Sequence, residues 1–161
     1  MTAARTRTAV VRTVDESERR WFYGGGVHDW KLREEETDGA FLLFEDTAEQ
    51  GKVTPLHTHP AAETVYVLAG EIVMHLDGTD HPLGEGGVAM APPGVPHAFK
   101  VVSPTARLLF LHTPGGCQAF YLAASEPMTE ETERLVDFDR IVGAAESEGG
   151  IDIVGPPPFG P

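Results

Sequence analysis

Three histidines and one glutamate carry the most informative chemistry in this sequence. His57 and His59 lie two residues apart in a β-like run, Glu63 follows shortly after Pro60, and His97 comes after a proline-glycine turn. On a strand, residues i and i+2 share a face and lie about 6.6 Å apart along the chain. Two imidazoles placed in this way can lean toward one ion. Glu63 can add a carboxylate oxygen, and His97 can add a third imidazole from a neighbouring strand.

This set of donors predicts a site for one divalent transition metal ion. Three neutral imidazole nitrogens and one carboxylate suit iron, nickel, manganese, cobalt or zinc. Four protein ligands on an octahedral ion leave two positions open, and catalysis needs open positions. The alternative is that each histidine is an ordinary core or surface residue. Only the spacing of the wider pattern favours the metal site.

That spacing resembles the two sequence motifs of the cupin superfamily. The first motif ends in His-x-His, three residues, Glu, six residues and Gly, and the second contains Pro-x-Gly, two residues and His. The matching positions are Gly51, His57, His59, Glu63 and Gly70 for the first motif, and Gly86, Pro92, Gly94 and His97 for the second. Val101 stands where the family has an asparagine, which is not a metal ligand there. The resemblance implies His57, His59, Glu63 and His97 as metal ligands.

The resemblance also implies an all-β fold, the cupin-type double-stranded β-helix or jelly-roll barrel, and a homodimer. Short β-like runs separated by turn residues agree with this fold class. We predict an N-terminal arm over 1–20 that could be a swapped edge strand, and a barrel over 21–125. Residues 126–161 should form a short C-terminal helix and a proline-rich tail. The predicted strands are Trp21–Tyr23, Val27–Arg33, Ala40–Phe44, Lys52–His57, Glu63–Leu68, Glu71–Leu76, Gly87–Ala91, His97–Val102, Ala106–His112 and Gln118–Leu122.

Three details of this pattern can be checked directly. Asp77 and Gly78 form a strong hairpin signal. Thr129 can cap a helix whose apolar stripe begins at Leu135 and Val136. A last strand is predicted over Ile151–Val154.

Composition narrows the function classes. The chain has 25 acidic and 12 basic residues, a formal charge of −13. Such a surface repels phosphate backbones and anionic membranes, so neither nucleic acid nor a membrane is an expected partner. Cys117 is the single cysteine, so no internal disulfide can form and a cytoplasmic location is expected. We expect this cysteine to be a small apolar residue rather than a reactive thiol.

Strand parity predicts which side chains surround the ion. If His57 and His59 point inward, then Glu63 does too, and the same alternation selects a substrate pocket. The predicted pocket residues are Trp30, Val65, Val67, Met74 and Phe99. The cavity should therefore be apolar with few polar groups. His112 ends an apolar strand and is expected to be structural.

These features favour an oxygenase that acts on a small aromatic or enolic substrate with O2. Glu63 would accept the proton of the substrate, with its pKa raised by burial. The chain also resembles bacterial single cupins of the quercetin 2,3-dioxygenase-like group, through Trp21-Phe22, the run 113–120 and the ending 151–157. The alternative is a non-catalytic, metal-dependent small-molecule binding or sensor cupin. A sugar isomerase is less favoured, because the inferred cavity lacks cationic residues.

Overall fold

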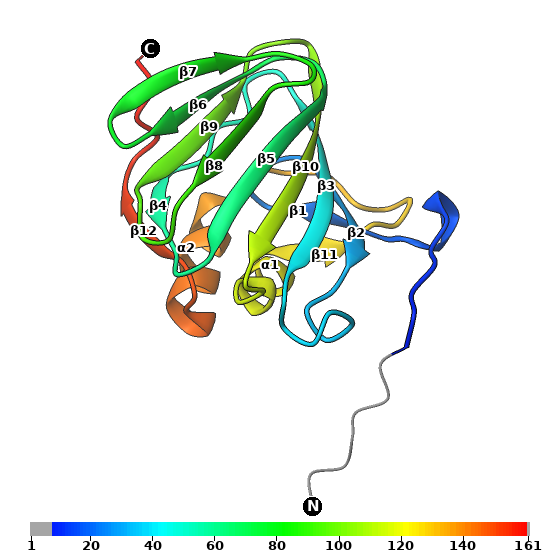
Figure 1. Ribbon diagram of the computed structural model, residues 1–161. Helices are drawn as coiled ribbons and strands as arrows, with labels where there is room; N and C mark the ends of the chain where they lie inside the picture. Colours follow the sequence, from blue (N-terminus) through cyan, green and yellow to red (C-terminus); the bar gives the residue numbers. More distant parts are fainter. Residues whose placement is uncertain (1–7, 161) are drawn as a thin grey trace, which may run out of the picture.

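Two antiparallel sheets form the body of the protein, as seen in the computed structural model, which describes residues 8–160. The larger sheet has seven strands in the order β11-β1-β2-β3-β10-β5-β8, and the smaller has five in the order β12-β4-β9-β6-β7. Figure 1 shows the strands wrapping around a common interior, with both helices at one end. The predicted all-β, jelly-roll fold class is confirmed.

Twelve strands and three short helical segments are found in the described residues, with one helical segment before the first strand and the other two near the C-terminus. The strands are β1 (Glu18–Phe22), β2 (Val27–Leu32), β3 (Leu42–Glu49), β4 (Leu56–Thr58), β5 (Ala62–Ala69), β6 (Ile72–Leu76), β7 (Thr79–Leu83), β8 (Val88–Ala91), β9 (His97–Val101), β10 (Thr105–Thr113), β11 (Ser125–Pro127) and β12 (Asp152–Gly155). The helical segments are η1 (Val14–Glu16), α1 (Gln118–Ala123) and α2 (Phe138–Glu148). No helix within 8–160 is long and apolar enough to cross a membrane.

The alternation of side chains along the central strands builds the core. Strand β10 pairs with β3 on one side and with β5 on the other. On β5, Val65 and Val67 are fully buried, and Glu63 shares their face and their burial. Because strand residues point alternately to opposite faces, Glu63 points into the barrel on the same face as these apolar core residues.

A tight hairpin joins β6 to β7. Asp77 and Gly78 both have positive φ, 46° and 81°, which confirms the predicted turn. Strand β7 was absent from the predicted strands, because its residues are mostly exposed and polar and include Pro82. It forms the edge of the smaller sheet, where a proline is tolerated.

The predicted strand over Gln118–Leu122 is wrong, because this segment is helix α1. Its run of alanine, aromatic and leucine residues suits either a helix or a strand. Phe120 and Tyr121 are both buried in the core. A one-turn helix can place two consecutive aromatic side chains against the same core, whereas a strand would point them to opposite faces.

The predicted start of the C-terminal helix is also wrong. Thr129 instead makes local turn hydrogen bonds with Thr132. Helix α2 begins only at Phe138, after the N-cap Asp137 accepts a hydrogen bond from the backbone N–H of Arg140. The predicted last strand is present as β12, which pairs with β4.

The predicted N-terminal arm lies partly outside the described residues, at positions 1–7. Its final residues form the start of β1, which pairs with β2 and β11 of the same chain. An exchanged strand and a homodimer stay predictions.

Gly70 provides a test of how tightly the turn after β5 is packed. It has φ +84°, and a Cβ here would overlap the carbonyl oxygen of Thr105 and lie 2.8 Å from Cα of Ala106. Gly78 has nearly the same φ, +81°, and no atom within 4 Å of such a Cβ. We expect Gly70→Ala to lower the free energy of unfolding by about 1–3 kcal/mol more than Gly78→Ala, because only the first adds overpacking to the backbone strain. Urea denaturation of both variants measures this difference, and equal losses would contradict the described packing.

Candidate metal centre

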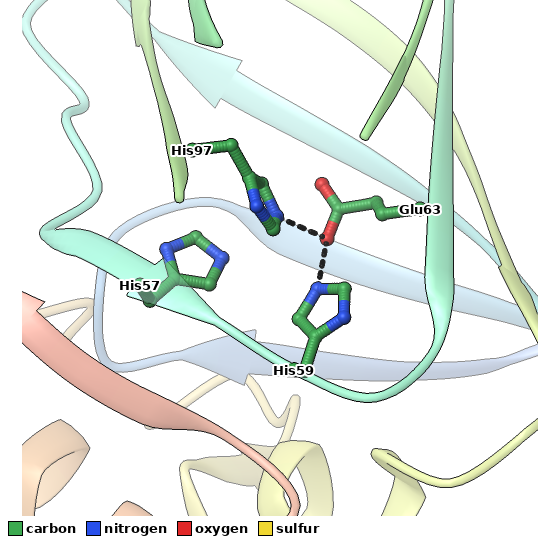
Figure 2. A group of neighbouring side chains, drawn as sticks. All are labelled: His57, His59, Glu63 and His97. Atoms are coloured by element: carbon green, nitrogen blue, oxygen red, sulfur yellow. Dashed lines mark hydrogen bonds and ion pairs between the residues drawn. The ribbon is translucent and has the colours of Figure 1, made fainter. Parts of the chain in front are cut away.

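Three strands and one connecting turn bring the four predicted ligands together. His57 lies on β4, where its Cα is paired with that of His97 on β9. His59 lies in the turn after β4, and Glu63 lies near the start of β5. Their ligand atoms all lie within 4.8 Å of one another. Figure 2 shows one oxygen of Glu63 facing both His59 and His97.

Backbone carbonyls fix the orientation of all three imidazoles. The Nδ1–H of His57 donates to Pro55 O, that of His59 to Ala61 O and that of His97 to Val95 O, each at 2.8 Å. A carbonyl oxygen can only accept, so Nδ1 must carry the proton in each ring. In a neutral ring, the lone pair of Nε2 is then left free. Such outer hydrogen bonds are typical of histidines that bind metals.

The free nitrogens and the carboxylate therefore converge as four acceptors. Nε2 of His59 lies 3.0 Å from Oε2 of Glu63, and Nε2 of His97 lies 3.3 Å from the same oxygen. Two lone pairs repel at this distance unless a proton or another cation lies between them. Atoms that bind one ion at about 2.1 Å lie up to about 4.2 Å apart, so a small side-chain adjustment allows all four to share it. The donor set therefore fits one metal ion.

The electrostatics of the cluster centre on Glu63. Its burial alone would raise the pKa of the carboxyl. When His97 and His59 are protonated, the charge of His97 and the hydrogen bonds of both rings instead hold the pKa of Glu63 well below its usual range. The expectation of a raised pKa is therefore wrong, because the imidazoles of His97, His59 and His112 outweigh the loss of hydration. Glu63 is ionised in this environment.

The pKa values of His57 and His97 shift in opposite directions. Burial, assisted by the charge of His97, lowers the pKa of His57 to about 4. Burial also opposes the charged form of His97, but the carboxylate of Glu63 raises the pKa of His97 above its ordinary value. Positive charge is therefore most favourable in the part of the cluster where His97 faces Glu63.

His112 lies closer to this centre than the sequence suggested. It is fully buried, and its Nε2 lies 3.6 Å from Oε2 of Glu63 and 3.3 Å from Oη of Tyr121. The signal that could have found it is the pairing of β10 with β5, which places His112 opposite Glu63. With His59 and Cys117 it also forms a second group of possible ligand atoms within 4.8 Å.

An apolar cavity opens beside the cluster and is lined by both His57 and Glu63. Phe99 lines this cavity, whereas the other four residues expected in a substrate pocket do not and are buried in the core. These four residues are Trp30, Val65, Val67 and Met74. The aromatic residues that line the cavity are Phe22, Phe44, Phe99, Phe110, Phe120, Tyr121 and Phe138.

The cavity is less purely apolar than predicted. Lys52, Asp46 and His28 also line it, and all three are buried. The expectation that the cavity lacks a cationic residue is therefore wrong. Asp46 could have been found from parity, because it shares the inward face of β3 with Phe44 and Ala48.

Known proteins share this fold. Residues 44–113 match the family described as Cupin domain. The quercetin 2,3-dioxygenase of Bacillus subtilis is 24% identical over 133 residues, which are 80% of this chain but only 40% of that protein. The chain thus spans less than half of that relative.

Two solved structures have the same fold. An RmlC-like cupin from Shewanella frigidimarina superimposes with a TM-score of 0.59 at 18% identity, covering 66% of this chain and 92% of the other. A predicted oxalate decarboxylase from Thermotoga maritima gives a TM-score of 0.57 at 25% identity, covering 65% of this chain and 99% of the other. The chain therefore has a cupin-like fold with a match to the cupin domain over residues 44–113, and it resembles the quercetin 2,3-dioxygenase-like proteins.

Metal content tests the ligand set. We expect His57→Ala and His97→Ala each to lose one equivalent of bound metal, because each removes one of four converging donors. His81→Ala is the matched control, since this histidine is exposed on β7. Elemental analysis after reconstitution measures the content, and full metal in both ligand variants would refute the assignment.

The reactivity of Cys117 tests its environment. Burial, together with nearby Glu63 and Glu34, raises the pKa of this thiol to about 12. At pH 8 the thiol is therefore protonated and enclosed, so we expect a disulfide reagent such as DTNB to modify it only after denaturation. Rapid modification of the folded protein would show that Cys117 is exposed or ionised.

Proposed function

We propose that this protein is a metal-dependent cupin oxygenase that oxidises or cleaves a small aromatic or enolic substrate with O2. One observation carries the proposal: four potential ligand atoms converge, and two of the residues that supply them, His57 and Glu63, line a cavity that also contains seven aromatic side chains. The cavity volume is about 50 Å³, so the lining side chains must move apart before a flat ring can stack against them with an acidic hydroxyl at the centre.

His57, His59, Glu63 and His97 would hold one divalent ion, and iron, nickel, manganese, cobalt and zinc all suit this donor set. When bound, such an ion supplies a Lewis acid with open coordination positions. The three backbone carbonyls that accept from Nδ1 hold the imidazoles ready for it. Little reorganisation is then required on binding.

Glu63 is the proposed proton acceptor. Its pKa lies well below the usual range, so Glu63 is ionised at neutral pH, and it would accept the proton of a substrate hydroxyl whose own pKa the bound ion lowers. It lines the cavity and so can meet the substrate directly. The aromatic lining would exclude water and hold the ring of the substrate against the centre.

The resemblance to a protein named quercetin 2,3-dioxygenase supports a flavonol-like substrate. A sugar phosphate is less well matched, because the cationic group of Lys52 is already paired with Asp46. Flavonols are therefore the first compounds to assay.

Oxygen consumption tests the proposal. Protein purified without oxygen and reconstituted with each metal in turn should consume O2 when a flavonol panel is added. Glu63→Gln keeps the size of the side chain but removes the base, so we expect turnover to fall about 100-fold or more. Glu71→Gln, at an exposed position, is the control and should keep turnover. Tight ligand binding without oxygen consumption under any metal would instead indicate a binding or sensor protein.

A further inference from the structure

Besides His57 and Glu63, the cavity contains a second cluster of polar residues, formed by Lys52, Asp46 and His28. All three are buried and line the same cavity as His57 and Glu63. His28 lies on β2, Asp46 on β3, and Lys52 in the segment between β3 and β4. The cavity therefore has two polar clusters, this one and the candidate metal centre, and their residues come from both sheets.

A buried ion pair is the core of this second group. Nζ of Lys52 donates to Oδ2 of Asp46, and both side chains are at least 96% buried, with exposed fractions of 4% and 1%. The same Nζ lies 5.2 Å from the ring centroid of Phe22 and 5.5 Å from that of Phe99. Replacing such a pair with apolar residues of similar size is often neutral or stabilising. Stability alone therefore gives no reason to keep this pair in an aromatic cavity.

The group also has unused hydrogen-bonding capacity. Within the described residues, Oδ1 of Asp46 and Nδ1 of His28 have no hydrogen-bond partner. Nε2 of His28 lies 3.9 Å from Oδ1 of Asp46, too far for a hydrogen bond. An ammonium group has three N–H donors, and among residues 8–160 Asp46 is the one hydrogen-bond acceptor found for that of Lys52. Buried polar atoms without partners are rare in native proteins and call for an explanation.

Aromatic rings surround these polar atoms. The ring of His28 stacks on Phe22 with centroids 4.5 Å apart and lies 4.6 Å from the ring of Phe44. Burial and the charge of Lys52 lower the pKa of His28 well below its usual range, so this ring is neutral. The site thus offers one cation, one anion and a neutral imidazole among flat apolar faces.

We propose that Lys52, Asp46 and His28 bind a hydroxyl group on an aromatic ligand, at a position separate from the oxygen that reaches the candidate metal centre. A phenolic hydroxyl can donate to Oδ1 of Asp46 and accept from Nζ of Lys52, which satisfies both groups at once. A carboxylate is a poorer match, because it has no proton to donate and would face the negative charge of Asp46. The inference rests on the proposed function and narrows its substrate class to aromatic compounds with a second hydroxyl.

The test compares two probes in the metal-loaded protein without oxygen. 3-Hydroxyflavone carries the enolic hydroxyl alone, and quercetin carries the same hydroxyl with further hydroxyls on its other rings. We expect the wild-type protein to bind quercetin about tenfold more tightly, since a hydrogen bond to a charged group discriminates by at least this factor. In Asp46→Leu/Lys52→Met the affinities for the two probes should become about equal. The metal content and the affinity for 3-hydroxyflavone should be retained.

The double variant removes both charges together, so neither is left buried alone. Glu45→Leu/Arg107→Met is the matched control, because it removes an ion pair of 3.2 Å outside the lining of the cavity. This control should keep the preference for quercetin. An unchanged preference in Asp46→Leu/Lys52→Met, equal affinities in the wild-type protein, or loss of both probes with metal retained would each overturn the inference. Failure of the wild-type protein to bind either probe would instead count against the flavonol class itself, and with it this inference.

Discussion

The site depends on the burial of one carboxylate, that of Glu63, among imidazole rings whose orientations are fixed by hydrogen bonds to the backbone. Glu63 is buried, and the Nδ1–H groups of His57, His59 and His97 are all committed to backbone carbonyls. Four acceptors facing one point are unfavourable without positive charge between them. A cation at that point relieves the repulsion and links three separate strands or turns of the barrel. Stability and chemistry are therefore coupled at the same few atoms.

The barrel explains why this arrangement can form at all. The pairing of β10 with β5 fixes Glu63 on the inward face, and the pairing of β4 with β9 brings His57 beside His97. A shift of either register by one residue would turn a ligand out of the barrel. The same parity places Asp46 inside on β3, so the alternation that builds the core also brings polar groups into the cavity.

The sequence was sufficient for the features that depend on local spacing. The two cupin motifs predicted the fold and the four residues that meet at the centre, and parity predicted the burial of Val65 and Val67. Features that depend on distant packing were missed. Strand β3 runs to Glu49 through polar residues that ended the predicted strand at Phe44, and so Asp46 was not recognised as inward-facing. The choice of helix for α1 and the buried position of Lys52 depend on contacts that no local pattern contains.

The central claim is that His57, His59, Glu63 and His97 share one ion. Anomalous diffraction from crystals of the metal-reconstituted protein, collected on both sides of the absorption edge of the added metal, tests it most directly. The account predicts a single anomalous peak about 2.0–2.2 Å from the three Nε2 atoms and a carboxylate oxygen of Glu63. A peak bound by His59, His112 and Cys117 instead, or no peak in the barrel, would contradict it.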